Sequence, residues 1–111
     1  MAELLHLTER ALWDAARASG QYEMSTRGRT LQDVGFIHCS LRHQLPGVAE
    51  FLYGTYTGPD DLVVLVIDEN RLSAPVCYEP SAPGAEDFPH IYGPLPIEAV
   101  IAVEPWPKAN A

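Results

Sequence analysis

Two histidines lie in apolar segments that end in polar or turn-forming residues. One segment is Gly35-Phe36-Ile37-His38-Cys39-Ser40, and the other is Phe88-Pro89-His90-Ile91-Tyr92-Gly93. A strand that delivers polar groups to its own end often borders a pocket. An imidazole at such a place can bond to a sugar or a phosphate, move a proton or bind a metal.

A third histidine, His6, lies near the start of the chain among leucines. If the strands that carry His6, His38 and His90 are neighbours, the three rings would line one cleft. The alternative is that each ring is a half-buried polar group satisfied by the backbone. Three histidines in matched settings favour the cleft.

Two further side chains accompany these motifs. Ser40 follows the His38 strand, so its hydroxyl and the next amides could surround a phosphate or a ribose, or it could be an ordinary helix N-cap. Tyr92 lies two positions after His90 and shares its strand face, where it could stack on a flat ligand or pack at the edge of the core.

Glu79 is the acid best placed within a strand-like segment, where it could stabilise a developing cation or take a proton. A solvated glutamate at a strand end is the alternative. No metal is expected, because only His43 is suitably spaced from His38 and that pair spans a strand-to-turn junction. Adjacent strand residues face opposite ways, so His38 does not activate Cys39, and we expect Cys39 and Cys77 to be buried and structural.

Size and charge limit the possible classes of function. The chain has 111 residues and a net charge of −8, from 7 basic and 15 acidic residues. One domain of this size has a single core, and its acidity disfavours binding to bulk nucleic acid. Neither a basic leader nor a long apolar run is present, which predicts a cytoplasmic protein without a membrane span.

Hydrophobic patterning predicts an α+β single domain at residues 1–107 with a tail at 108–111. Two helices in the N-terminal half would lie on a twisted mixed or antiparallel sheet. The first helix would run from a Thr8 cap to Ser19 and end at Gly20, and the second would open at Pro46 and end near Tyr53. An exposed loop is expected at residues 21–34. Strands are expected at residues 4–7, from 36, at 62–67 as a central strand, and at 76–79, 91–93 and 99–103.

The order of these motifs resembles a family of small bacterial proteins, domain of unknown function 952, over nearly the whole chain. The resemblance implies a fold related to ADP-ribosyltransferases. Within that group, His6-Leu7-Thr8 is similar to the His-Gly-Thr element of NAD-dependent transferases, whose histidine bonds a ribose hydroxyl. Ile37-His38-Cys39-Ser40 is similar to a strand of RNA 2'-phosphotransferases.

These observations predict a cleft that binds NAD, ADP-ribose or a related nucleotide. The residues expected to bind the ligand are His6, Thr8, Ser40, His90 and Tyr92. His38 and Glu79 are the expected catalytic residues, with Glu79 stabilising an oxocarbenium-like transition state. The alternatives are a ligand-binding or regulatory module without activity and, third, a metal-dependent hydrolase that uses the three histidines.

Overall fold

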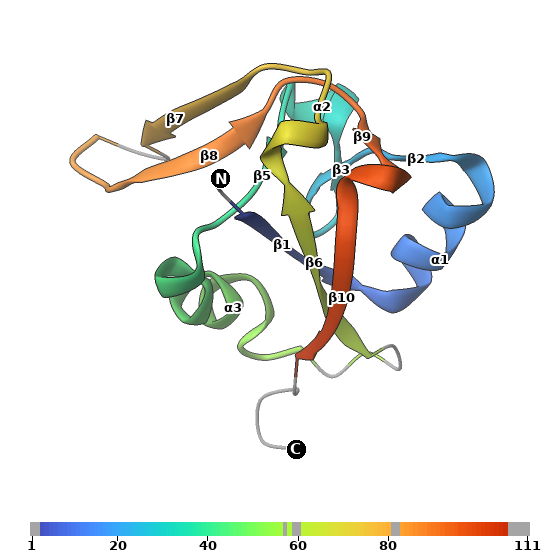
Figure 1. The fold of residues 1–111 in the computed structure, drawn as a ribbon. Coiled ribbons are helices and arrows are strands. Elements are labelled where there is room, and N and C mark those ends of the chain that lie inside the picture. Colours follow the sequence, from blue (N-terminus) through green and yellow to red (C-terminus); the bar gives the residue numbers. More distant parts are fainter. Residues whose placement is uncertain (1–2, 57, 59–60, 81–82, 107–111) are drawn as a thin grey trace.

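Strand β6 (Leu62–Asp68) lies at the centre of the fold (Figure 1). In the computed structural model, which describes residues 3–56, 58, 61–80 and 83–106, Leu62 to Ile67 are all buried. The strand is β-branched and apolar on both faces, so it must be covered on both sides. The flanking strands β1 (Glu3–Glu9) and β10 (Val100–Trp106) pair antiparallel with it, as the prediction of a central strand requires.

One helix covers each face of this sheet. Helix α1 (Arg10–Ser19) buries Trp13 and Ala16 in the same cluster as Val63 and Leu65. Helix α3 (Leu45–Tyr53) packs on the other face, with the following cluster of buried residues: Leu5, Leu7, Leu45, Ala49, Tyr53, Tyr56, Leu62, Val64 and Val66. The predicted α+β architecture with two helices on an antiparallel sheet is confirmed.

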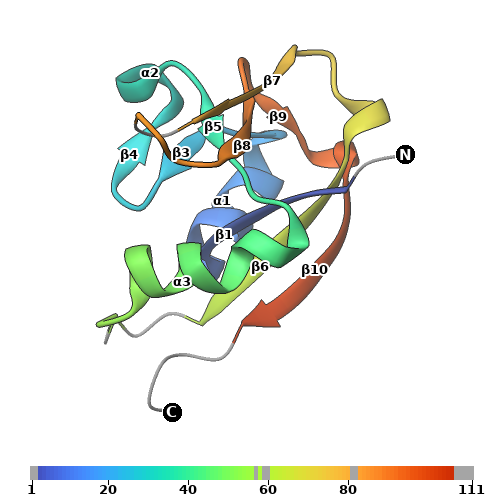
Figure 2. The same ribbon diagram turned by 90° about the vertical axis from the view of Figure 1, so that its left-hand side faces the viewer.

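A second sheet lies across one end of the first (Figures 1 and 2). It has the order β5-β8-β7, with all strands antiparallel, and its strands are β5 (Ile37–His38), β8 (Asp87–Ile91) and β7 (Val76–Pro80). A single bridge between Leu5 and Ser40 joins it to β1, with N···O distances of 2.7 and 2.8 Å. The predicted strand at 91–93 is displaced, because β8 ends at Ile91.

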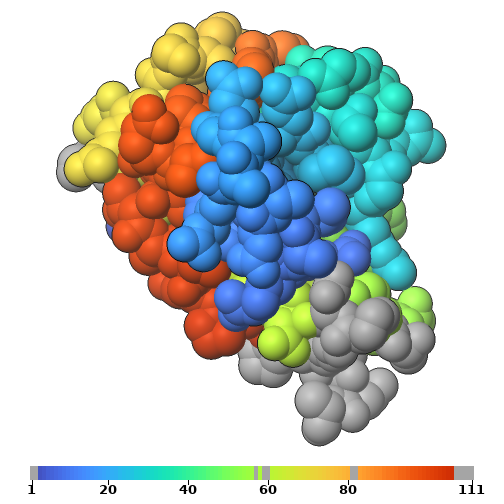
Figure 3. Space-filling view, turned by 90° about the vertical axis from the view of Figure 1, so that its right-hand side faces the viewer, coloured from blue at the N-terminus to red at the C-terminus, as the bar shows by residue number. Residues whose placement is uncertain are grey.

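The remaining elements are short. They are β2 (Gln21–Tyr22) paired with β9 (Leu95–Pro96), β3 (Met24–Thr26) paired with β4 (Arg29–Thr30), helix α2 (Leu31–Val34), and single 3-10 turns at 42–44, 69–71 and 97–99. Figure 3 shows the face opposite to that of Figure 2, where α1 lies beside the surface of residues 95–106. No helix in the described ranges is long and apolar enough to cross a membrane.

Some local predictions are confirmed and others are wrong. Gly20 ends α1 in the left-handed conformation, at φ 99°, and Pro46 lies in the first turn of α3. The exposed loop at 21–34 is wrong, because this segment holds β2, β3, β4 and α2. Thr8 does not cap α1, since β1 continues through it to Glu9.

Further predictions concern the two cysteines and the C-terminal tail. Cys39 is fully buried, as expected, whereas Cys77 is exposed, because it lies on β7, an edge strand of its sheet. The predicted tail at 108–111 lies outside the described residues.

A polar chain crosses the core beside β1. The His6 ring is 3% exposed, with Nδ1 2.7 Å from the carbonyl oxygen of His38 and Nε2 2.7 Å from the Tyr22 hydroxyl. That hydroxyl lies 2.8 Å from Oγ1 of Thr8. A carbonyl only accepts, so in the neutral ring Nδ1 carries the hydrogen and donates to His38, and Nε2 is the nitrogen bonded to the Tyr22 hydroxyl. Each of the side chains His6, Tyr22 and Thr8 in this buried row therefore has a hydrogen-bond partner.

This arrangement predicts a pH dependence of stability. Burial lowers the pKa of His6 to about 4, although its bond to the His38 carbonyl opposes the shift. In the unfolded chain the pKa is about 6.5, so between these values the unfolded state binds more protons. Through His6 alone, the free energy of unfolding should fall by up to about 3 kcal/mol as pH drops from 6.5 to 4, measured as the difference between the parent and a His6 variant in urea denaturation.

The matched variant is His6→Asn, whose amide can still donate to the His38 carbonyl. We expect it to be less stable than the parent at pH 7.5, because the Tyr22 hydroxyl loses its bond to the ring and the smaller side chain leaves space in the core. Its stability should also change less between pH 6.5 and 4.5. An unchanged pH slope in this variant would contradict the burial argument.

Candidate functional site

A cavity of about 940 Å³ lies between the β5-β8-β7 sheet and helix α3. Figure 2 shows α3 facing the segments that carry α2, β3 and β5. The residues that line the cavity are Thr26, Val34, Phe36, His38, Gln44, Gly47, Val48, Phe51, Leu52, Glu79, Pro80, Glu86, Phe88 and His90. It is therefore an aromatic and aliphatic cavity with a small polar group of side chains, as small-molecule sites usually are.

Strand register explains why the polar residues meet there. His38 pairs with His90, and Glu79 pairs with Phe88, which lies two residues before His90 on β8. Side chains of paired residues share a face, so these four side chains lie on the cavity face of the sheet. Ile37 and its partner Ile91 point the other way and are fully buried in the core.

Glu79 links His90 to Tyr92. Its Oε1 accepts from Nδ1 of His90 at 2.9 Å and from the Tyr92 hydroxyl at 2.5 Å. The bond from Tyr92, and then the bond from His90, holds the pKa of Glu79 below its ordinary value. The same contact with the carboxylate raises the pKa of Tyr92 to about 12. The carboxylate is therefore charged near neutral pH, and the tyrosine is protonated.

His90 has one satisfied nitrogen and one that is not. Its ring is 3% exposed and stacks on Phe36, with centroids 4.0 Å apart and planes 16° apart. With Nδ1–H donating to Glu79, Nε2 of the neutral ring is an acceptor. Nε2 is buried and has no hydrogen-bond partner among the described residues. Because such groups are rare in folded proteins, this nitrogen marks a candidate contact for a ligand or a water.

His38 is the second imidazole at the cavity. Its ring centroid lies 5.3 Å from that of His90 and 5.0 Å from that of Phe88. Burial, and then the proximity of His90 and His6, lowers the pKa of His38 to about 4. At neutral pH this ring is therefore uncharged and can donate or accept one hydrogen bond.

The other predicted site residues occupy different places. Tyr92 is 39% exposed and reaches the cavity group through Glu79. His6 and Thr8 belong to the buried polar chain, and His6 contacts the site only through the His38 carbonyl. Ser40 is buried at the bridge to Leu5 and begins no helix, since the next turn starts after Leu41. None of His6, Thr8 and Ser40 lines the cavity.

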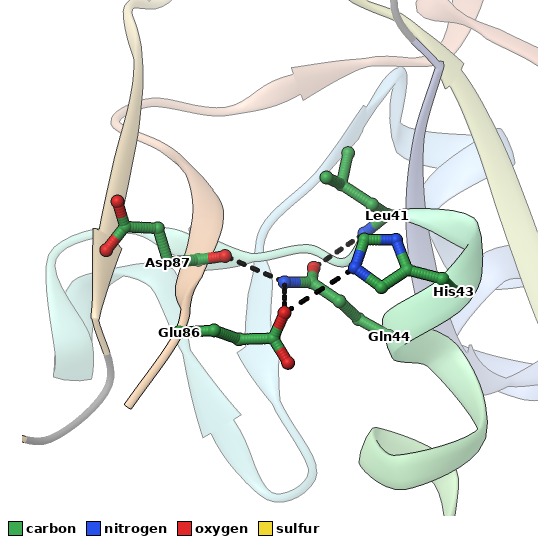
Figure 4. A network of polar contacts seen from close by, with 5 residues as sticks. All are labelled: Leu41, His43, Gln44, Glu86 and Asp87. Carbon is green, nitrogen blue, oxygen red and sulfur yellow. Dashed lines mark hydrogen bonds and ion pairs between the residues drawn. The ribbon is translucent and has the colours of Figure 1, made fainter. Parts of the chain in front are cut away.

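Gln44 joins α3 to the loop before β8, a role that sequence reasoning missed. Its Nε2 donates to Oε2 of Glu86 at 3.0 Å and to the Asp87 carbonyl at 2.7 Å, while its Oε1 accepts from the Leu41 amide at 2.9 Å (Figure 4). His43 lies 3.5 Å from the same Glu86 oxygen. Gln44 is buried, and its bonds hold the start of α3 against the loop before β8.

Phe36 and Phe88 were also missed, although a signal for them exists. Each lies two positions before a histidine, so the i, i+2 rule places each ring on the same strand face as its histidine. Phe51 had no such signal, because a helix residue that is 87% exposed does not stand out in the pattern of α3.

Among the described residues, no Lys or Arg side chain lines the cavity. Arg27, next to Thr26, donates to the Leu52 carbonyl at 2.8 Å and lies over the rings of Tyr53 and Tyr56. No group of three or more potential metal ligands occurs in the part of the chain that the structure describes.

The pKa of Glu79 gives a test of this geometry. Tyr92→Phe removes the hydrogen bond that lowers the pKa of Glu79 most, so this pKa should rise towards 4.5. The pH titration of the Glu79 side-chain carboxyl carbon by ¹³C NMR measures this change. Tyr78→Phe is the matched control, because Tyr78 points to the other face of β7. Equal pKa values in the two variants would contradict the arrangement.

Comparison with other proteins places this chain among relatives. A solved crystal structure of protein CC0527 from Caulobacter crescentus is 28% identical, with a TM-score of 0.70, covering 94% of this chain and 85% of that one. A solution NMR structure of the same protein is 31% identical, with a TM-score of 0.69, covering 93% and 83%. No curated protein matches.

A family model described as "Protein of unknown function (DUF952)" matches residues 7–103, which is most of the chain. The match contains the paired histidine strands and the cavity, and it begins one residue after His6. The chain therefore belongs to the DUF952 family of proteins of unknown function.

Proposed function

We propose that the chain binds a small organic molecule with a flat ring in the cavity described above. A nucleoside is the proposed example of such a ligand. One observation carries the proposal: His90 is tied at Nδ1 to Glu79, whereas its buried Nε2 has no partner among the described residues. A donor on a ligand would satisfy this acceptor, which the protein alone leaves unpaired.

The shape and lining of the cavity support this class of ligand. Its volume of about 940 Å³ falls within the usual range for small-molecule sites. The rings of Phe36, Phe51 and Phe88 offer faces on which a flat heterocycle can stack. Nε2 has almost no exposed surface, so a ligand reaches it when a neighbouring ring moves aside.

The Glu79–His90 pair can also do chemistry. A carboxylate at Nδ1 fixes the tautomer and favours the imidazolium that forms when Nε2 takes a proton. Nε2 of His90 is therefore the proposed acceptor for a ligand hydroxyl or N–H, and Glu79 is a positioning residue for it.

A more specific version of the proposal is that the ligand is NAD or ADP-ribose and that the protein transfers a ribosyl group. This version also proposes a fold like that of the ADP-ribosyltransferases. The link between Glu79 and His90 favours transfer, because a carboxylate beside the site can stabilise a positively charged ribosyl group. In this form, His38 and His90 orient the ribose. His6 and Thr8 act from the core by holding the His38 backbone, and Tyr92 acts by holding Glu79.

Binding is tested by titrating ¹⁵N-labelled protein with adenosine, ADP-ribose and NAD. We expect adenosine at millimolar concentration to shift the amide resonances of Phe36, His38 and His90. His90→Phe keeps a ring against Phe36 but removes both nitrogens, so affinity should fall about three- to tenfold, the value of one hydrogen bond. His43→Phe alters an exposed histidine outside the lining and should keep affinity near that of the parent.

The same titration can refute the proposal. If none of the three ligands moves cavity resonances at millimolar concentration, nucleoside binding is wrong. If they bind equally well to the parent and to His90→Phe, then His90 is not the acceptor.

Transfer is tested separately, by measuring nicotinamide release from NAD by chromatography. An active transferase should lose about 100-fold or more in Glu79→Gln. Ligand binding without any release from the parent protein would support the non-enzymatic module instead.

A further inference from the structure

Resting on the broader form of the proposed function, a ligand with a flat ring, and not on its NAD form, we infer that the cavity selects organic cations, that is, flat-ringed ligands that carry a positive charge, over neutral and anionic ligands of the same shape. The inference concerns the charge of the ligand, which the stacking and hydrogen-bonding argument leaves open. It follows from the arrangement of carboxylates and aromatic faces around the cavity.

The charged side chains that line the cavity are carboxylates. Glu79 and Glu86 contribute to the lining, and no described lining residue is Lys or Arg. The nearest candidate, Arg27, is held at the Leu52 carbonyl and over two tyrosine rings. A phosphate ester in this cavity would have carboxylates as its charged neighbours, at a further cost in a protein of net charge −8.

Glu79 keeps one oxygen available. Both of its hydrogen bonds, from His90 and from Tyr92, go to Oε1, and Oε2 has no hydrogen-bond partner in the described part of the chain. Because Tyr92 and His90 hold the carboxylate in one orientation, little side-chain entropy remains to be lost when a cation approaches Oε2. Glu79 is thus a preorganised anionic contact.

Glu86 is held in a similar way at the other end of β8. Nε2 of Gln44 donates to its Oε2 at 3.0 Å, and Gln44 is itself anchored at the Leu41 amide and the Asp87 carbonyl (Figure 4). The carboxylate is 60% exposed, so it can attract a cation at the mouth of the cavity.

Thr26 and Gln44 are uncharged, and much of the remaining lining is aromatic or aliphatic. Burial keeps His38 uncharged near neutral pH, so this ring does not repel a cation. Phe36, Phe51 and Phe88 present ring faces, and Phe51 is 87% exposed. A positive charge over such faces is attracted by their quadrupoles, an interaction that a neutral or anionic ligand does not gain.

The test uses three indoles that share a ring and an N–H donor but differ in charge: tryptamine (+1), indole-3-ethanol (0) and indole-3-propionate (−1). Each is titrated into ¹⁵N-labelled protein at pH 7.5 and low salt, and the shifts of the Phe36, His38 and His90 amides are followed. Tryptamine should bind about tenfold tighter than indole-3-ethanol, and indole-3-propionate should bind most weakly.

Charge-neutralising variants locate the effect. Glu79→Gln and Glu86→Gln should each reduce the preference for tryptamine over indole-3-ethanol about threefold or more, because each removes one negative charge from the lining. Glu98→Gln, which removes one exposed negative charge outside the lining, is the matched control and should keep the preference.

The outcomes separate the two proposals. Equal affinities for the three indoles would overturn the charge selection and leave the proposed function standing. Shifts from none of the three indoles, and none from adenosine, would overturn both. An equal loss of preference in Glu98→Gln and in the two lining variants would show a general field effect of the acidic protein and would overturn the role of the cavity carboxylates.

Discussion

The pairing of β5 with β8 is the constraint on which the site depends. It places Ile37 opposite Ile91 in the core and His38 opposite His90 at the cavity. A shift of one residue would turn the isoleucines to the cavity and the imidazoles into the core. Two fully buried isoleucines thus specify the register, and the bond from the Cys39 amide to the Pro89 carbonyl at 2.9 Å extends it.

The His38 residue joins the interior to the cavity. Its carbonyl accepts from the buried His6 ring, while its side chain lines the cavity. His6 is in turn held by Tyr22, which lies at the pairing of β2 with β9. A histidine that contacts no ligand can therefore matter to a site, because it holds the backbone that presents another histidine.

Elements can be predicted from the sequence when their hydrophobic pattern extends over many residues, or when a glycine or proline marks where they end or begin. Apolar residues on both faces predict β6, and Gly20 and Pro46 mark the end of α1 and the start of α3. Strands of two or three residues, as at 21–30, are too short to show a period, so they were missed. Likewise, chemistry and spacing indicate His38, His90 and Glu79, but only the long-range pairing of β5, β8 and β7 shows that they meet, whereas His6 stays in the core.

The cavity has one wall from the β5-β8-β7 sheet and one from α3, and the residues of these two walls differ in how freely they can change among relatives. The sheet wall is tied by strand pairing to core residues, so a substitution there also affects folding. The wall from α3 is not tied to the core by strand pairing, and an added Cβ at Gly47 would meet no atom within 4 Å. Relatives can therefore acquire a larger residue at this position, shorten the cavity and recognise a different ligand, while the histidine pair and the fold stay the same.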